Sequence, residues 1–130
     1  MTPVPVVAAA LIDGEGRVLV QRRRADRAHG GLWEYPGGKL EPGEIPELGL
    51  IREIEEELGI GIGQESLAWV ASAQEPGAPI VISLYTCREW LGEPQLLDAE
   101  QLAWVVPSDL SSLEMPPLDV TLTRELLRRI

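Results

Sequence analysis

Three glutamates, Glu53, Glu56 and Glu57, stand close together in an acidic part of the chain. Helical side chains three and four positions apart share a face, so these carboxylates can reach one point in space. Like charges at these spacings repel each other by roughly 0.2–0.5 kcal/mol per pair. Carboxylate oxygens are the ligands that Mg²⁺, Mn²⁺ and Ca²⁺ prefer. The spacing therefore indicates a cation site, and Mg²⁺ that also bridges to substrate phosphates suits a partial cage of this kind.

The wider acidic run has two interpretations. Seven of the 21 acidic residues lie between Glu41 and Glu57, and only Arg52 opposes them within that stretch. A run of like charges is usually a solvated surface. The regular spacing of the glutamates favours the cation site over that interpretation.

A helix between Pro46 and Gly59 is expected to carry these carboxylates. Proline suits the first turn of a helix, and glycine suits the position just past its end. The apolar residues that share one arc are Leu48, Leu50, Ile51, Ile54 and Leu58, and Arg52, Glu53, Glu56 and Glu57 lie on the opposite arc. Gly49 lies within the acidic arc, where the missing side chain leaves room for another group to approach.

The rest of the chain reads as strands with a closing helix. Strands are expected at residues 4–12, 17–22, 67–74, 80–90 and 101–105, and the first two are expected to form a hairpin around the turn at residues 13–16. Residues 32–35 form a short apolar segment, and the glycine- and proline-rich residues 36–43 are expected to form a loop. One or two helical turns are expected at residues 107–113 and a helix at residues 119–130, with Arg128 and Arg129 favourably placed at its end.

Length and composition indicate a single domain over residues 1–130 in a soluble protein. No apolar stretch is long enough to span a bilayer, and no signal peptide is recognised. The single cysteine, Cys87, suits a reducing cytoplasm and is expected to be buried packing. The net charge of −10 disfavours binding to a nucleic-acid polymer but not to a nucleotide whose phosphates a metal neutralises. The oligomeric state is left open.

A longer motif surrounds the glutamates. Gly38, Glu44 and the run Arg-Glu-Ile-Glu-Glu-Glu-Leu-Gly-Ile at residues 52–60 match all nine defined positions of a 23-residue pattern, the Nudix box. The chain therefore resembles the Nudix hydrolases, and MutT-like members in particular. Weaker similarity continues through residues 32–39, 89–94 and 115–119, and at Trp104. The resemblance implies an α/β (α+β) fold in which a mixed sheet is sandwiched between helices, with the box as loop–helix–loop.

The resemblance also implies a metal site. Glu56 and Glu57 would bind Mg²⁺, for which Mn²⁺ can substitute, with help from the backbone carbonyl of Gly37. Glu53 would be either a further ligand or the base that activates water. Phosphoryl transfer needs positioning and charge neutralisation more than covalent chemistry, and such a site can supply both.

Two other box residues would support this site. Arg52 would orient the base, and Glu44 would support the metal site from the loop. MutT-like members often add a metal carboxylate just before the last tryptophan, but Ala103 stands there in this chain. Asp98 and Glu100 are the nearest substitutes.

Substrate contacts are expected on both sides of the box. Lys39, the only lysine, follows Gly38 directly, and both are expected at a phosphate, although Lys39 could simply balance the nearby glutamates. Arg23, within the basic run at residues 22–24, is expected at a phosphate or sugar.

The base would be read elsewhere. Asp119 stands where MutT-like enzymes place a residue that reads the base edge, but it could also cap the last helix. Tyr35 could stack on the base or belong to the core.

The implied reaction is attack of water on phosphorus in a nucleoside triphosphate, such as 8-oxo-dGTP, giving a nucleoside monophosphate and pyrophosphate. ADP-ribose is the alternative substrate, because members acting on it often carry a proline about 16 residues past the box, where Pro76 stands. A non-catalytic nucleotide-binding module is a further alternative. Such modules usually lose a box glutamate, and none is lost here.

Overall fold

The computed structural model describes residues 2–130 and places seven strands and two α-helices in that range. The strands are β1 (Val4–Leu11), β2 (Val18–Arg22), β3 (Trp33–Glu34), β4 (Gly37–Lys39), β5 (Leu67–Ala73), β6 (Ile80–Cys87) and β7 (Gln101–Val105), and the helices are α1 (Pro46–Leu58) and α2 (Pro117–Leu127). Short 3₁₀ turns lie at Gln64–Ser66 and Pro107–Ser112. None of the helices in this range is long and apolar enough to cross a membrane.

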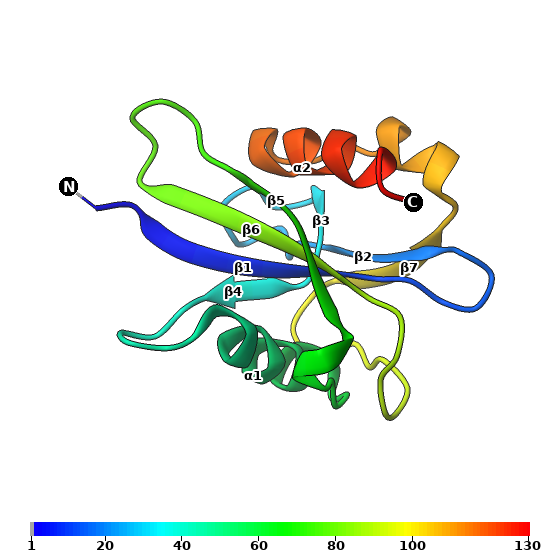
Figure 1. The fold of residues 1–130 in the computed structure, drawn as a ribbon. Coiled ribbons are helices and arrows are strands. Elements are labelled where there is room, and N and C mark those ends of the chain that lie inside the picture. The colour runs from blue at the N-terminus through cyan, green and yellow to red at the C-terminus, as the bar shows by residue number, and fades with distance from the viewer. Residues whose placement is uncertain (1) are drawn as a thin grey trace.

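The strands form two sheets between the helices. One sheet has the order β4-β1-β6-β5 and the other the order β3-β2-β7. The β1–β6 pair is parallel and the other pairs are antiparallel, so the strand arrangement is mixed. Helices α2 and α1 lie on opposite sides of the strands (Figure 1). This arrangement confirms the expected helix–sheet–helix fold.

Strand β1 is apolar along its length because it serves two cores. Ala8 and Ala10 contribute to the cluster that packs with α2, whereas Val7, Ala9 and Leu11 contribute to the cluster that packs with α1. All five are buried. Successive strand residues point to opposite faces, so a strand covered on both sides needs an unbroken apolar run.

Helix α1 has the predicted boundaries. Pro46 occupies the first turn, where its missing N–H costs nothing. Gly59 ends the helix in the left-handed region at φ 69°, and its N–H donates to the carbonyl of Glu55 at 2.9 Å. A glycine adopts that backbone conformation without the steric penalty of a Cβ.

The apolar face of α1 is narrower than predicted. Leu50, Ile54 and Leu58 are completely buried, whereas Leu48 is 46% exposed. The predicted space at Gly49 is filled from within the chain, because a Cβ there would meet the side chains of Leu40 and Glu44. The glycine therefore lets the preceding loop pack against the helix.

The predicted hairpin of the first two strands is wrong. The turn forms, with Asp13 accepting hydrogen bonds from the backbone N–H of Glu15 and Arg17. However, β2 pairs with β3 and β7, and only an isolated bridge between Ile12 and Val18 joins it to β1. The reason is that β4 and β6 already occupy the two edges of β1.

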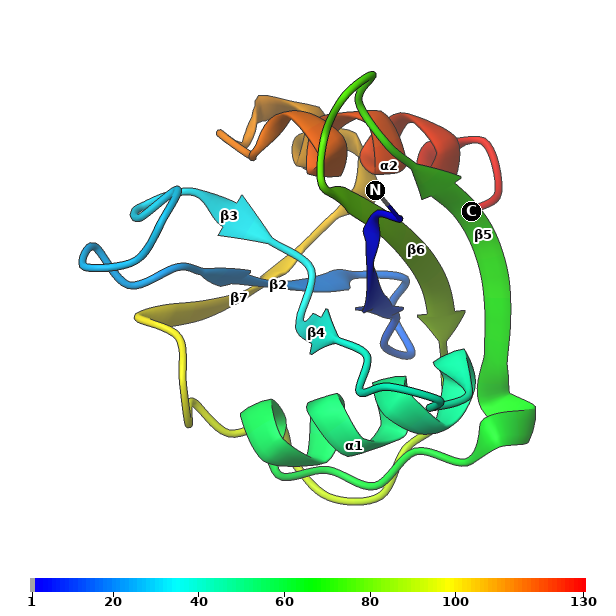
Figure 2. The same ribbon diagram turned by 90° about the vertical axis from the view of Figure 1, so that its left-hand side faces the viewer.

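The predicted loop at residues 36–43 contains strand β4. Gly37 and Gly38 lie opposite Ala8 and Val7 of β1, and a Cβ at Gly37 would collide with that backbone. Figure 2 shows β3 and β4 following one another between α2 and α1. The strand thus brings the start of the box against the centre of the sheet.

Several smaller differences lie at element ends. Strand β6 ends at Cys87, which is buried as predicted. Trp90, beyond that strand, stacks on Trp104 with ring centroids 5.9 Å apart, in the core beside α1. Helix α2 begins at Pro117, before Asp119, and ends at Leu127.

Candidate active site

Arg52 connects three of the box carboxylates. Its Nε and Nη2 donate to the two oxygens of Glu44, each at 2.9 Å. Its Nη1 donates to Glu53 at 3.0 Å and lies 3.3 Å from Glu56. Hydrogen bonds from Arg52 hold the pKa of Glu44 at about 2, so Glu44 is a fixed anion that orients the guanidinium.

Glu57 is held by residues other than Arg52. Its Oε2 accepts from the side-chain nitrogen of Gln21 at 3.0 Å and from the backbone N–H of Gly37 at 3.4 Å. Burial raises the pKa of Glu57 to about 8, and the negative charges of Glu34 and Glu53 add to that effect. Burial likewise raises the pKa of Glu53 above its ordinary value.

Gly38 makes room for Glu53. A Cβ on Gly38 would lie about 2.7 Å from Oε1 of the Glu53 carboxylate, which is closer than a Cβ atom approaches a non-bonded oxygen. Gly37 has the corresponding role against the backbone of β1. The two glycines therefore let β4 approach both the helix carboxylates and the central strand.

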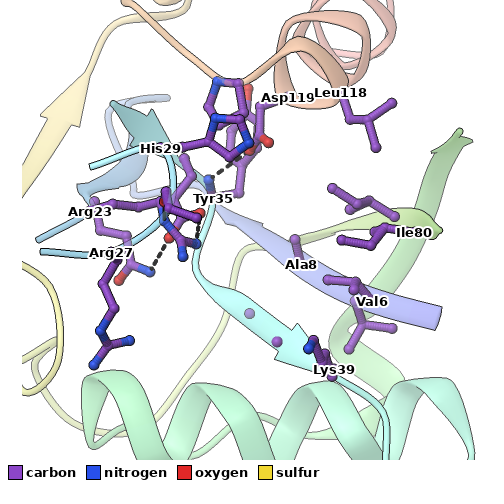
Figure 3. A pocket seen from close by; sticks show the side chains of 18 of the residues that line it. Val6, Ala8, Arg23, Arg27, His29, Tyr35, Lys39, Ile80, Leu118 and Asp119 are labelled. Atoms are coloured by element: carbon purple, nitrogen blue, oxygen red, sulfur yellow. Dashed lines mark hydrogen bonds and ion pairs between the residues drawn. The ribbon is translucent and has the colours of Figure 1, made fainter. Parts of the chain in front are cut away.

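A cleft of about 610 Å³ runs from Glu57 of α1 to the start of α2. Apolar side chains form one wall, namely Val6, Ala8, Ile80, Ile82 and Leu118. Arg23 and Arg27 lie across from that wall, and Lys39 lies beside α1 (Figure 3). The cleft thus joins an apolar wall to a charged end.

Asp119 and Tyr35 lie at the α2 end of the cleft. The backbone N–H of Tyr35 donates to Asp119 at 3.4 Å (Figure 3), and the Tyr35 hydroxyl lies 2.6 Å from the Thr123 hydroxyl. Tyr35 is only 3% exposed and belongs to the core beside α2. Burial raises the pKa of Asp119 to about 7, assisted by the charge of Glu34.

The capping role considered for Asp119 is wrong. The residue that precedes α2 is Pro116, and no side chain caps the helix there. Asp119 is instead buried within the first helical turn, and it lines the cleft. Its position leaves base recognition as the role to be tested.

The two substitute ligands differ in position. Asp98 lines the cleft, as Glu57 does, and forms an ion pair with Arg27 at 3.5 Å. Glu100 forms an ion pair with Arg22 at 3.7 Å and does not line this cleft. The structure therefore places Asp98, and not Glu100, beside the other candidate residues.

The predicted phosphate contacts also border the cleft. Lys39 is exposed, and its backbone carbonyl accepts from Arg52 at 3.3 Å. Arg23 lines the cleft but is already paired with Glu34 at 2.9 Å. Both cations lie close enough to the cleft to contact a ligand within it.

The box glutamates do not converge on one point. Within residues 2–130, no three acidic, histidine or cysteine side chains form a group arranged to hold a metal. Arg52 attracts Glu53 and Glu56, whereas Glu57 turns to Gln21. Mutual repulsion favours this separation.

The donor chemistry nevertheless fits a hard divalent cation. Glu53, Glu56 and Glu57 stand three and four positions apart on α1, and the pKa of Glu57 is raised in part by neighbouring negative charge. A divalent cation at this position would relieve that repulsion. The residues present therefore suit the metal that the motif implies.

Sequence reasoning missed Gln21, Glu34 and His29. Gln21 is a buried polar residue that follows the apolar residues of β2. The alternation of side chains along the strand could have indicated that it points inward. Glu34 lies between Trp33 and Tyr35, and its carboxylate contacts Gln21 and Arg23. His29 borders the cleft from an exposed loop, with φ 57°. Its place in the basic loop before the box pointed toward the site, but a lone histidine in a loop is more often solvated.

Comparison with known proteins agrees with this geometry. A family model described as the NUDIX domain matches residues 2–129. CTP pyrophosphohydrolase of Escherichia coli is 34% identical over 120 residues, which cover 89% of this chain and 86% of that protein. An 8-oxo-dGTP diphosphatase of Haemophilus influenzae is 34% identical over 122 residues, 93% of this chain and 90% of that protein.

A solved structure shows the same relationship. The solution structure of the Escherichia coli ORF135 protein superposes with a TM-score of 0.84 at 30% identity. The match covers 98% of this chain and 91% of that one. The box motif, the fold around it and these relatives agree, so the chain belongs to the Nudix hydrolases and is MutT-like.

Proposed function

We propose that this protein is a Mg²⁺-dependent pyrophosphohydrolase that converts a nucleoside triphosphate to a nucleoside monophosphate and pyrophosphate. The observation that carries the proposal is the continuous cleft that extends from the apolar wall to Glu57 of α1. A base fits against the wall, and the phosphates then extend toward the box carboxylates. The relatives named for CTP and 8-oxo-dGTP support this class of substrate.

The cation site would be formed by Glu56 and Glu57, with the carbonyl of Gly37, with Asp98 from the β6–β7 loop, and with Glu53 if that carboxylate does not act as the base. Bound Mg²⁺ would neutralise phosphate charge and promote ionisation of the attacking water. A cation placed here would lie at the charged end of the cleft, where the phosphates are expected.

Glu53 is our candidate for the base that accepts the proton of the water. Burial raises its pKa above the ordinary value, which brings it closer to the range useful for proton transfer. Arg52 holds this carboxylate at 3.0 Å, and Glu44 holds Arg52 through two hydrogen bonds. This chain of contacts fixes the direction in which Glu53 points.

Gly38 and Lys39 would contact the phosphates, and Arg23 would contact a phosphate or the sugar. Both cations border the cleft. An ammonium group on an exposed side chain can follow the phosphates as they move, whereas the paired guanidinium of Arg23 is held in place.

Asp119 would read the base, beside Tyr35. A protonated carboxyl offers one donor and one acceptor, and an ionised one offers acceptors only. Cytosine presents adjacent N4–H donor and N3 acceptor groups, and 8-oxoguanine presents N7–H and O6. The protonated form of Asp119 suits either edge, so both bases belong in the test.

The deciding experiment is a nucleotide panel with Mg²⁺ and with EDTA, including CTP, 8-oxo-dGTP, the ordinary triphosphates and ADP-ribose. Pyrophosphate and phosphate release are scored separately. We expect metal-dependent pyrophosphate release from one or a few triphosphates. Efficient AMP release from ADP-ribose with poor triphosphate turnover would overturn the proposed substrate.

ADP-ribose remains the comparison substrate because the cleft extends to Glu75, Ala78 and Pro79 in the β5–β6 turn. Pro76, the residue that suggested this substrate, belongs to the same turn but does not line the cleft. If no member of the panel is hydrolysed but one binds, the chain is a nucleotide-binding module.

A further inference from the structure

Gln21 is a buried polar side chain between two carboxylates. It lies at the end of β2, opposite Glu34 of β3, and is 3% exposed. The preceding residues of the strand, Val18, Leu19 and Val20, are apolar and buried. An apolar side chain of similar length would continue that pattern, so the amide needs a separate explanation.

The amide nitrogen of Gln21 is shared by residues from different elements. Nε2 donates to Oε2 of Glu34 at 3.2 Å and to Oε2 of Glu57 at 3.0 Å. Its carbonyl oxygen is buried and, within the described chain, has no hydrogen-bond partner. Leaving such an atom unpaired opposes folding, so packing alone does not account for glutamine at this position.

The contacts of Gln21 determine which oxygen of Glu57 is available. Both hydrogen bonds to Glu57, from Gln21 and from the backbone of Gly37, go to Oε2. Oε1 of Glu57 accepts no hydrogen bond from residues 2–130. The carboxylate is thus held by one oxygen, and the other is left to face a ligand.

Gln21 also links two residues that line the cleft, Arg23 and Glu57. Glu34 accepts from Arg23 at 2.9 Å through Oε1 and from Gln21 through Oε2. A continuous series of hydrogen bonds therefore runs from Arg23 through Glu34 and Gln21 to Glu57. Arg23, at one end of this series, lines the cleft, and Glu57, at the other end, is a proposed cation ligand.

We propose that Gln21 is a positioning residue that holds Glu57 by Oε2 and presents Oε1 to the divalent cation. The inference rests on the proposed function of the box glutamates as metal ligands. Groups that hydrogen-bond to metal ligands typically affect metal affinity or activity roughly 10- to 100-fold when removed. Loss of the Gln21 amide is expected to act within that range.

The test compares Gln21→Met with Gln101→Met, the same substitution at an exposed position on the neighbouring strand β7. Mn²⁺ binding is measured by electron paramagnetic resonance without nucleotide, and thermal unfolding is measured without metal. We expect Gln21→Met to weaken Mn²⁺ binding roughly 10- to 100-fold with no loss of thermal stability. Gln101→Met is expected to match the parent.

Kinetics provide a second measurement. Because Gln21 acts through Glu57 and not on the substrate, raising the Mn²⁺ concentration should restore most of the kcat of Gln21→Met. A purely structural defect would not respond to metal in this way. Unchanged Mn²⁺ affinity in a folded Gln21→Met protein would overturn the inference.

Two further variants distinguish an error in the proposed metal site from an error in the role of Gln21. If Glu57→Gln binds Mn²⁺ as the parent does, the proposed metal site is wrong, whatever Gln21 does. If Gln21→Met does not fold, Gln21→Asn tests the same point, since the shorter amide cannot span both carboxylates. Full Mn²⁺ affinity in the folded asparagine variant would also contradict the positioning role.

Discussion

The glutamates of the box are chemically alike but differ in their surroundings. Glu44 lies against Arg52, which holds its pKa at about 2, whereas burial beside other carboxylates raises the pKa of Glu57 to about 8. Asp119, at the other end of the cleft, has a pKa raised to about 7. At neutral pH the site thus contains both a fixed anion and acids that can change their charge.

Glu57→Gln should abolish turnover and stabilise the metal-free protein. In the parent, a folded-state pKa of about 8 against an ordinary value of 4.5 means that stability falls as pH rises from about 4.5 to 8. The amide removes this loss, so the Tm of the variant in EDTA should exceed that of the parent at pH 8. The difference should shrink toward pH 4. Turnover should fall by at least roughly 100-fold, because a proposed metal ligand is lost.

Asp119→Asn should remove a pH dependence of KM. As pH rises through about 7, Asp119 loses the proton with which it donates to the base, and KM of the parent should increase. Asparagine keeps a donor and an acceptor at every pH. We expect a flat KM profile between pH 6 and 8.5 for the variant, measured on the best triphosphate of the panel. A parallel rise in both proteins would show that another group is responsible.

At the scale of elements, the sequence predicts those helices and strands whose own residues carry a pattern. The spacing of apolar residues in α1, with Pro46 and Gly59 at its ends, predicts the helix and aligns the box glutamates. Strand β4 lacks such a signal, because three residues with two glycines become a strand only by pairing with β1. The contacts of Gln21 with Glu34 and Glu57 likewise depend on the meeting of β2, β3 and α1, which no local pattern encodes.

Alanine substitutions in β4 should separate stability from activity. A Cβ at Gly38 meets the end of the Glu53 side chain, which can move, so Gly38→Ala should lower kcat with little change in Tm. A Cβ at Gly37 meets the backbone of Val7 and Ala8, which cannot move without disturbing the sheet. Gly37→Ala should therefore destabilise the fold by at least about 1–3 kcal/mol, measured by urea denaturation.

At the scale of the whole molecule, negative charge exceeds positive charge. The net charge is −10, and the cleft is lined both by cations and by carboxylates, among them Glu34, Glu57 and Asp119. A nucleotide adds more negative charge to an acidic protein. Binding should therefore depend on a divalent cation more than on the arginines alone.

Mg²⁺ or Mn²⁺ should raise the Tm of the parent in the absence of nucleotide. A ligand at 100 times its Kd adds about 2.7 kcal/mol to the stability of the folded state, which corresponds to a Tm increase of roughly 5–15 °C for a chain of this size. NaCl at matched ionic strength should give a much smaller change. Glu57→Gln should lose most of the specific increase, and an equal increase in both proteins would place the cation elsewhere.

The parallel pairing of β1 with β6 also affects how fast the site can assemble. Val4 lies beside Ile80 and Leu11 beside Cys87, so the central pair joins segments far apart in the sequence. Non-local pairing slows folding, because the entropy of closing a long loop is lost before the contacts form. During synthesis, the box emerges from the ribosome before β6 exists to complete the sheet around β1. The acidic helix therefore has its supporting sheet only after most of the chain has been made.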